Sequence, residues 1–175
     1  MLMRYPFDSE EAALLNKQVF ATIYYSAMRE SLELSKLHGA YSSFEGSPLS
    51  KGKFQFDLWK AEPEHTAGDM VLDWDSLRKD VMEHGVRNSL LLAPMPTAST
   101  AQILGNYECF EPIISNIYTR RVLAGEYMVL NNYLVKDLML CDLWPDVKNK
   151  IIANDGSIQN IDAVSYTHLR AHETG

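Results

Sequence analysis

The segment Pro94-Met95-Pro96-Thr97-Ala98-Ser99-Thr100 constrains the fold most, because two prolines within three residues exclude regular structure there. Before this segment, residues 87–93 are apolar enough to predict a buried strand. After it, residues 101–104 (Ala-Gln-Ile-Leu) predict the first turn of a helix. The chain must therefore turn there, between a strand and a helix.

Two interpretations of this turn are open. Small hydroxylic residues at a helix N-terminus can aim backbone amides at a phosphate group. The turn can equally be a connecting loop in which Ser99 or Thr100 caps the helix. Because the segment lacks the glycines and the lysine of a P-loop, its spacing alone does not favour the phosphate interpretation.

The segment from Pro94 to Asn106 resembles the substrate-diphosphate loop of the large (alpha) subunit of class I ribonucleotide reductase. Other stretches resemble the same family in the same order, and together they extend over residues 2–161. These stretches are residues 3–7, 41–52, 115–123 and 154–159.

The resemblance implies a fold and a site. The fold would be part of a ten-stranded α/β barrel made of two antiparallel half-barrels, helix-rich here with a few strands. Residues 1–163 would be a fragment of that catalytic barrel domain. The substrate's diphosphate would be held by five residues: Pro96, Thr97, Ala98, Ser99 and Thr100.

The family's reaction, as the resemblance implies it, reduces ribonucleoside diphosphates to deoxyribonucleoside diphosphates for DNA synthesis. A metal-dependent radical in a small (beta) subunit passes to a cysteine of the large subunit, which abstracts the 3′-hydrogen of the substrate. Two further cysteines deliver electrons. Thioredoxin or glutaredoxin restores them, large subunits form a homodimer, and ATP and other nucleotides act as allosteric effectors.

The cysteine motifs of this chemistry are not in the sequence. The Asn-x-Cys-x-Glu motif of the radical cysteine is absent, and Cys109 and Cys141 match neither it nor the reducing pair. We therefore expect no catalytic residue, bound cofactor or metal in this chain, and no reductase activity from the chain alone. The alternative is a non-catalytic phosphate-binding or decoy protein derived from such a subunit.

The two ends of the sequence suggest an internal piece of a longer gene. Residues 164–174 resemble the translation of a sequencing adapter, so residues 164–175 are expected to form a disordered tail. The four-residue spacing of His168 and His172, with Glu173 beside them, could suggest a helical metal site, but the further ligands of a closed site are missing. Met1 stands where the family sequence continues within the domain.

The charge and composition exclude some classes of partner. A net charge of −7 without a compensating basic patch argues against binding to nucleic acid. No apolar run approaches the length of a membrane span, and no signal peptide is visible. The two cysteines follow no pairing pattern, which is typical of a reducing compartment, so we expect a cytoplasmic protein.

Local signals predict the remaining elements. Helices are expected from Asp8 to His38, from Asp75 to Gly85, from Asn131 or Asn132 to Asp142, and from Pro145 to Gly156. Residues 117–123 and 126–130 predict a hairpin about Gly125, whereas residues 40–57 predict a loop and residues 60–69 a surface excursion. The first helix should face inward through Leu15, Val19, Ile23, Ala27 and Leu34, with Phe20, Tyr24 and Met28 widening that face.

Three further groups of polar residues have both a functional and a structural interpretation. Arg120 and Arg121 could clamp a phosphate, but strand alternation places them on opposite faces, so one should pair with a carboxylate and the other meet solvent. Glu108 and Glu111 could be an acid/base pair or a solvated edge. Tyr107 and Tyr118 are expected to pack rather than to carry a radical.

Overall fold

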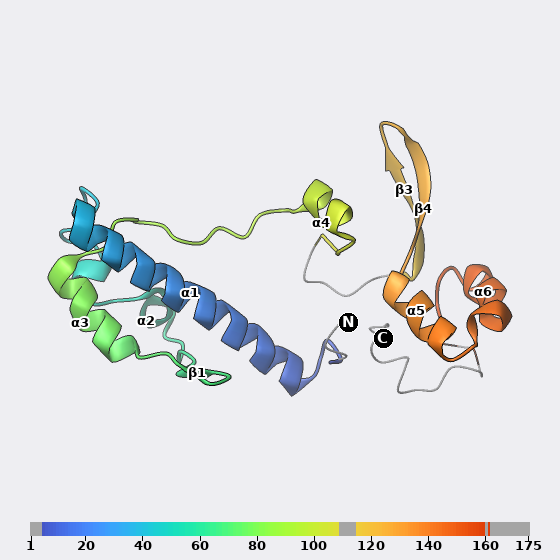
Figure 1. The fold of residues 1–175 in the computed structure, drawn as a ribbon, viewed down its shortest axis with the longest axis horizontal. Coiled ribbons are helices and arrows are strands. Elements are labelled where there is room, and N and C mark those ends of the chain that lie inside the picture. The colour runs from blue at the N-terminus through green and yellow to red at the C-terminus, as the bar shows by residue number, and fades with distance from the viewer. Residues whose placement is uncertain (1–4, 109–114, 160, 162–175) are drawn as a thin grey trace. The chain divides into compact units, whose positions relative to one another are not determined.

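The structure is a computed structural model that describes residues 5–108, 115–159 and 161, and only the backbone of Ala98. The chain forms two units: residues 13–95, and residues 1–12 together with 96–175 (Figure 1). The first-named unit contains most of α1 (Glu10–His38), then η1 (Leu49–Lys51), α2 (Gln55–Trp59), β1 (Thr66–Ala67), β2 (Met70–Val71) and α3 (Trp74–His84). The other contains α4 (Ala98–Leu104), β3 (Ile117–Val122), β4 (Gly125–Leu130), α5 (Asn132–Leu140) and α6 (Trp144–Ala153).

Helix α1 confirms the first predicted helix, with a different cap. The Oγ atom of Ser9 accepts a hydrogen bond from the Ala12 amide at 3.1 Å, so the cap is Ser9 and not Asp8. At the other end Gly39 has φ = +81° and its amide donates to Ser35 O, which is a left-handed helix stop.

The buried face of α1 differs from the predicted one. Val19 and Ile23 remain 45% and 43% exposed, whereas Met28 and Leu32 are 1% and 2% exposed. The helix is apolar on two sides, and only contact with the rest of the unit determines which side is covered. The predicted widening at Met28 is confirmed, and the buried side of α1 consists of Tyr25, Met28, Ser31, Leu32 and Ser35.

The core of this unit is rich in aromatic side chains. Trp74, the first residue of α3, contacts the rings of Tyr25 and Phe56 edge to face, with centroids 5.0 and 4.9 Å away. Asp73 caps α3 by accepting from the Ser76 amide at 3.0 Å, so the helix begins at Trp74 and not at the predicted Asp75. Leu77 and Val81 of α3 face inward, since both are buried.

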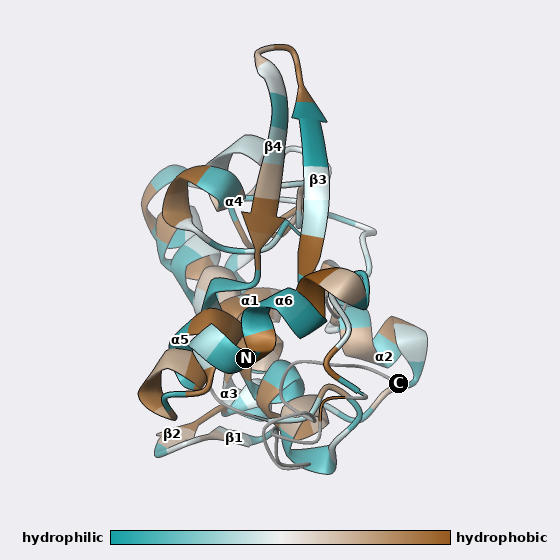
Figure 2. Cartoon of the chain, turned by 90° about the vertical axis from the view of Figure 1, so that its right-hand side faces the viewer, coloured by the Kyte–Doolittle hydropathy of each residue, from teal (hydrophilic) through white to brown (hydrophobic). Residues whose placement is uncertain are grey.

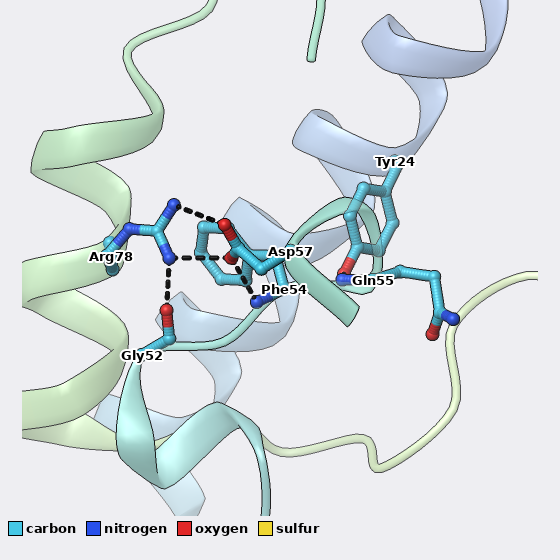
Figure 3. A network of polar contacts seen from close by, with 6 residues as sticks. All are labelled: Tyr24, Gly52, Phe54, Gln55, Asp57 and Arg78. Atoms are coloured by element: carbon cyan, nitrogen blue, oxygen red, sulfur yellow. Dashed lines mark hydrogen bonds and ion pairs between the residues drawn. The ribbon is translucent and has the colours of Figure 1, made fainter. Parts of the chain in front are cut away.

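Arg78 of α3 binds the end of the loop that contains residues 41–52, one of the stretches that resemble the family (Figure 3). Its guanidinium donates to the Asp57 carboxylate at 2.7 and 3.3 Å and also to the Gly52 carbonyl, and it lies 5.0 Å from the centre of the Phe54 ring. The hydrogen bond from Arg78 is the main cause that lowers the pKa of Asp57. Gly52 has φ = +66°, a left-handed conformation that favours glycine, and a Cβ there would lie 2.7 Å from the sulfur of Met82.

The strand predicted for residues 87–93 is wrong. These residues form no helix or strand, and Leu90 and Leu92 are 88% and 44% exposed. The start of the segment is instead attached to α1, because the amides of Arg87 and Asn88 donate to the carbonyl and hydroxyl oxygens of Ser31, both at 2.9 Å. An apolar segment becomes a strand only when a neighbouring strand bonds its backbone, and no strand among the described residues pairs with residues 87–93.

The predicted hairpin is confirmed in the other unit. β3 and β4 pair antiparallel from Ile117↔Leu130 to Val122↔Gly125. Figure 2 shows β3 as apolar at its two ends and polar between them. Leu123 at the turn is fully exposed, so the hairpin is anchored at its base rather than at its tip.

Helices α5 and α6 confirm the last two predicted helices and form the core of this unit. Asn131 caps α5 through its Oδ1 atom, which accepts from the amides of Tyr133 and Leu134. Pro145 lies in the first turn of α6, as expected. The buried side chains of this core are Leu134, Leu138, Val147, Ile151, Ile158 and Ile161.

Candidate functional site

The proline-flanked segment leads directly into α4, which begins three residues earlier than predicted. Thr97 is the N-cap residue, and its side chain makes no capping hydrogen bond. Ser99 and Thr100 consequently lie in the first turn of the helix, so the alternative interpretation, in which one of them caps it, is wrong.

The first turn of α4 presents several hydrogen-bond donors. The amide of Ala101 donates to Thr97 O at 2.7 Å, and helix geometry leaves the preceding amides of the first turn without an intrahelical acceptor. The residues Ser99 and Thr100 are exposed, and the Thr100 hydroxyl donates to Thr97 O at 3.0 Å. The turn therefore combines a partial positive charge with the exposed hydroxyl of Ser99.

The opposite end of α4 is connected to β3 by side chains. Gly105 closes the helix with φ = +68°, and the amide of Asn106 donates to Ala101 O at 2.8 Å. Nε2 of Gln102 donates to Oε1 of Glu108 at 3.1 Å, and the same carboxylate forms an ion pair with Arg120 of β3. Sequence reasoning missed this network, because nothing local relates Glu108 to an arginine across residues 109–119.

The expectation for the two arginines is largely confirmed. Arg120 pairs with Glu108, and this hydrogen bond is the main cause that raises the pKa of Arg120. Arg121 is 82% exposed at its side chain and pairs with Glu126 across the hairpin. Glu108 is therefore a partner of Arg120, while Glu111 lies outside the described residues.

The remaining candidates that lie within the described residues form no second site. Tyr107 is half-buried, and burial is the largest cause that raises its pKa to about 12. Cys141 is an exposed free thiol, while Cys109, His168, His172 and Glu173 lie outside the described residues. Among the residues that are described, no three His, Cys, Asp or Glu side chains gather as metal ligands.

Two of the family-like stretches, residues 115–123 and 154–159, meet in a buried network of amides. Asn131 donates through Nδ2 to Oδ1 of Asn116 at 2.8 Å, and Asn116 donates in turn to Gly156 O at 2.9 Å. The hydroxyl of Ser115 contacts Asp155 O at 2.8 Å. These bonds fix the base of the hairpin against the end of α6, a contact between residues 40 positions apart.

A separate apolar groove of about 780 Å³ lies in the unit of residues 13–95. Its walls include Phe20, Tyr24, Phe56, Trp59 and Leu90. None of residues 96–100 lines it, and its walls are mainly apolar, with Lys17 and Lys53 among the few charged residues. The groove is therefore distinct in chemistry from the first turn of α4.

Comparison with known proteins identifies the family. The family described as "Ribonucleotide reductase, barrel domain" matches residues 1–174. The chain belongs to this ribonucleotide reductase family. Its relatives include the "Ribonucleoside-diphosphate reductase large subunit" of Caenorhabditis elegans, 58% identical over 165 residues, and "large chain 2" of the Saccharomyces cerevisiae enzyme, 54% identical over the same length. These alignments cover 94% of this chain and 20% and 18% of the relatives, so the chain spans about a fifth of their length.

A solved structure shows the same fold. The "Actinobacillus ureae class Id ribonucleotide reductase alpha subunit" matches 99% of this chain and 25% of its own with a TM-score of 0.63, at 23% identity. The expected fold class is thereby confirmed: the chain has the fold of part of a ribonucleotide reductase barrel, helix-rich with a few strands. The described residues form two separate two-stranded sheets and no closed barrel. None of their helices is long and apolar enough to cross a membrane.

Proposed function

We propose that this chain is part of the large subunit of a ribonucleoside-diphosphate reductase and supplies the loop that holds the substrate's diphosphate. The observation that carries the proposal is the 58% identity to a ribonucleoside-diphosphate reductase large subunit over 165 residues, which include the proline-flanked segment. The binding residues are Pro96, Thr97, Ala98, Ser99 and Thr100.

The chemistry of the first turn of α4 supports this role. Its unpaired amides carry partial positive charge toward an anion, and the exposed Ser99 hydroxyl adds a donor. The two prolines fix the approach of the chain to the helix. Binding the diphosphate at this turn would hold the ribose in register for the reaction, so that the energy of remote binding contributes to turnover.

The rest of the proposed reaction depends on parts outside this chain. The proposal includes a radical-generating small subunit, a second large subunit, nucleotide effectors, a thioredoxin or glutaredoxin as reductant and a cytoplasmic location. The sequence of this chain holds no Asn-x-Cys-x-Glu motif, so its own contribution is to bind and orient the substrate.

The test is Ser99→Asp in the full-length large subunit. A carboxylate about 4 Å from the diphosphate costs about 4 kcal/mol in a partly screened site, so the affinity for a ribonucleoside diphosphate should fall at least ~100-fold. Asn106→Asp is the matched control: it adds the same charge beyond the opposite end of α4, at an exposed position, and should change the affinity by less than about 3-fold.

Equilibrium binding of a labelled ribonucleoside diphosphate measures both variants. Ser99→Ala, which removes the hydroxyl and keeps the amide, should weaken binding by about 10-fold or less, the worth of one hydrogen bond. Unchanged affinity in Ser99→Asp would disprove the assignment of the loop.

A further inference from the structure

Glu108 connects the candidate diphosphate helix to the hairpin. Two donors converge on its Oε1 atom: Nε2 of Gln102 at 3.1 Å and a guanidinium nitrogen of Arg120. The three residues lie in different parts of the unit, in α4, in the segment after Gly105 and in β3. One carboxylate oxygen therefore links the C-terminal half of α4 to a strand.

This link has the geometry to orient α4. The helix has seven residues, which is about 10 Å or two turns, so its first turn follows any rotation of its second turn. The position of Arg120 is determined by the six-residue register of β3 with β4, in which it faces Tyr127. Fixing Gln102 against this strand therefore determines the direction in which the first-turn amides point.

The link is suited to positioning more than to holding the fold together. The side chains of Arg120 and Glu108 are 28% and 37% exposed, and ion pairs of such exposure contribute little to stability. The core of the unit, formed by α5, α6 and Ile158, lies elsewhere and involves neither residue. Loss of the carboxylate should leave the unit folded while releasing α4.

We propose that Glu108 is a positioning residue that sets the direction of α4 and thereby aligns the diphosphate loop with the substrate. This inference rests on the proposed function of residues 96–100. Glu108 itself has no contact with the substrate in this proposal and acts through Gln102 and Arg120.

The test uses steady-state kinetics of the full-length enzyme with its small subunit. Glu108→Ala should raise the KM for ribonucleoside diphosphates about 10-fold and also lower kcat, by a smaller factor, with an unchanged melting temperature. Glu108→Gln keeps an oxygen acceptor at the same place and should restore the KM to within about 3-fold of wild type. Glu126→Ala is the matched control, because it removes the carboxylate of the neighbouring Arg121 pair in the same hairpin and should leave KM unchanged.

A second variant separates positioning from general loss of structure. Gln102→Ala breaks only the helix side of the link, so it should raise KM in the same direction and add little to Glu108→Ala in the double variant. Hydrogen exchange of the α4 amides should be faster in both variants without substrate present.

The outcomes distinguish this inference from the proposed function. A KM in Glu108→Ala equal to that of Glu126→Ala overturns the inference, and so does additivity of Gln102→Ala with Glu108→Ala. If Ser99→Asp abolishes substrate binding while Glu108→Ala leaves KM unchanged, the loop assignment stands and only the positioning role fails. If Ser99→Asp leaves binding intact, the proposed function itself fails.

Discussion

Gly156 is the position at which a single methyl group should cause the greatest damage to the unit formed by α4 to α6. Its φ of +91° is a conformation that residues with a side chain rarely adopt. A Cβ atom there would lie 2.3 Å from Ser115 Oγ and 2.7 Å from the backbone nitrogen of Ile117. Ser115 Oγ cannot simply move away, since it is hydrogen-bonded to Asp155 O and Ile117 O at 2.8 and 2.7 Å.

The cost of Gly156→Ala follows from two contributions. The left-handed backbone conformation costs about 1–2 kcal/mol for a residue with a Cβ. Forcing a methyl group into a packed site costs about 1–3 kcal/mol more. Together they give about 2–5 kcal/mol, which is a large fraction of the stability of an ordinary domain. The unit should therefore open about 30-fold to several thousand-fold more often.

Hydrogen exchange followed by mass spectrometry measures this opening in each unit of the same molecule. Peptides from α5 and α6 should exchange faster in Gly156→Ala, whereas peptides from α3, which belongs to the other unit, should not change. Gly105→Ala is the matched control. Gly105 also has a positive φ, +68°, but a Cβ atom there would meet no other atom within 4 Å, so only the backbone contribution remains.

Comparing hydrogen exchange in the two alanine variants isolates the effect of the close contact at Gly156. Equal exchange in Gly156→Ala and Gly105→Ala would show that the close contact with Ser115 and Ile117 has no energetic effect. Adding Ser115→Ala to Gly156→Ala should recover part of the loss, since it removes the nearest atom and leaves the backbone contact with Ile117.

Two further predictions concern stability. Asp57→Asn should destabilise the unit of residues 13–95 by about 1 kcal/mol, the upper end for a partly exposed ion pair. The pKa of Asp57 is lowered below its ordinary 3.8 in the folded state, so its contribution to stability is complete above pH 3.8 and is lost as the pH falls through the folded pKa. Urea denaturation between pH 6 and about 3 should therefore show a pH-dependent loss of stability in the wild type that Asp57→Asn lacks. Identical pH profiles for the two proteins would contradict this prediction. Asn131→Ala removes the cap of α5 and leaves Oδ1 of the buried Asn116 without its donor, so it should cost about 2–4 kcal/mol; a loss below about 0.5 kcal/mol in denaturant unfolding would be incompatible with this network.

The elements that the sequence predicts correctly are those with local signals. The hairpin turn follows from Gly125 and alternating strand residues, and α5 begins beside Asn131, whose side chain caps the helix. These signals act between residues a few positions apart, so the sequence alone displays both partners. The errors at the starts of α1, α3 and α4 amount to one to three residues, and those at α1 and α3 reflect the competition between neighbouring polar residues for the same cap.

The errors of larger consequence concern contacts between distant residues. Residues 87–93 have the composition of a strand, yet they pair with no strand in the described structure, and their first amides bind Ser31 of α1. The apolar stripe predicted to face inward on α1 leaves Val19 and Ile23 largely exposed. In both cases the sequence shows a surface able to be buried but not the partner that would cover it.

For the candidate site, the sequence by itself determined that a proline-flanked turn of small hydroxylic residues leads into a helix, because proline and helix geometry leave few alternatives. The tertiary structure decided that Thr97 is the N-cap, that Glu108 joins α4 to Arg120, and that Gly156 lies against Ser115. The physical reason is the distance along the sequence over which each kind of interaction acts. Backbone preferences are properties of a few consecutive residues, whereas an ion pair or a close contact exists only once folding has brought distant residues together.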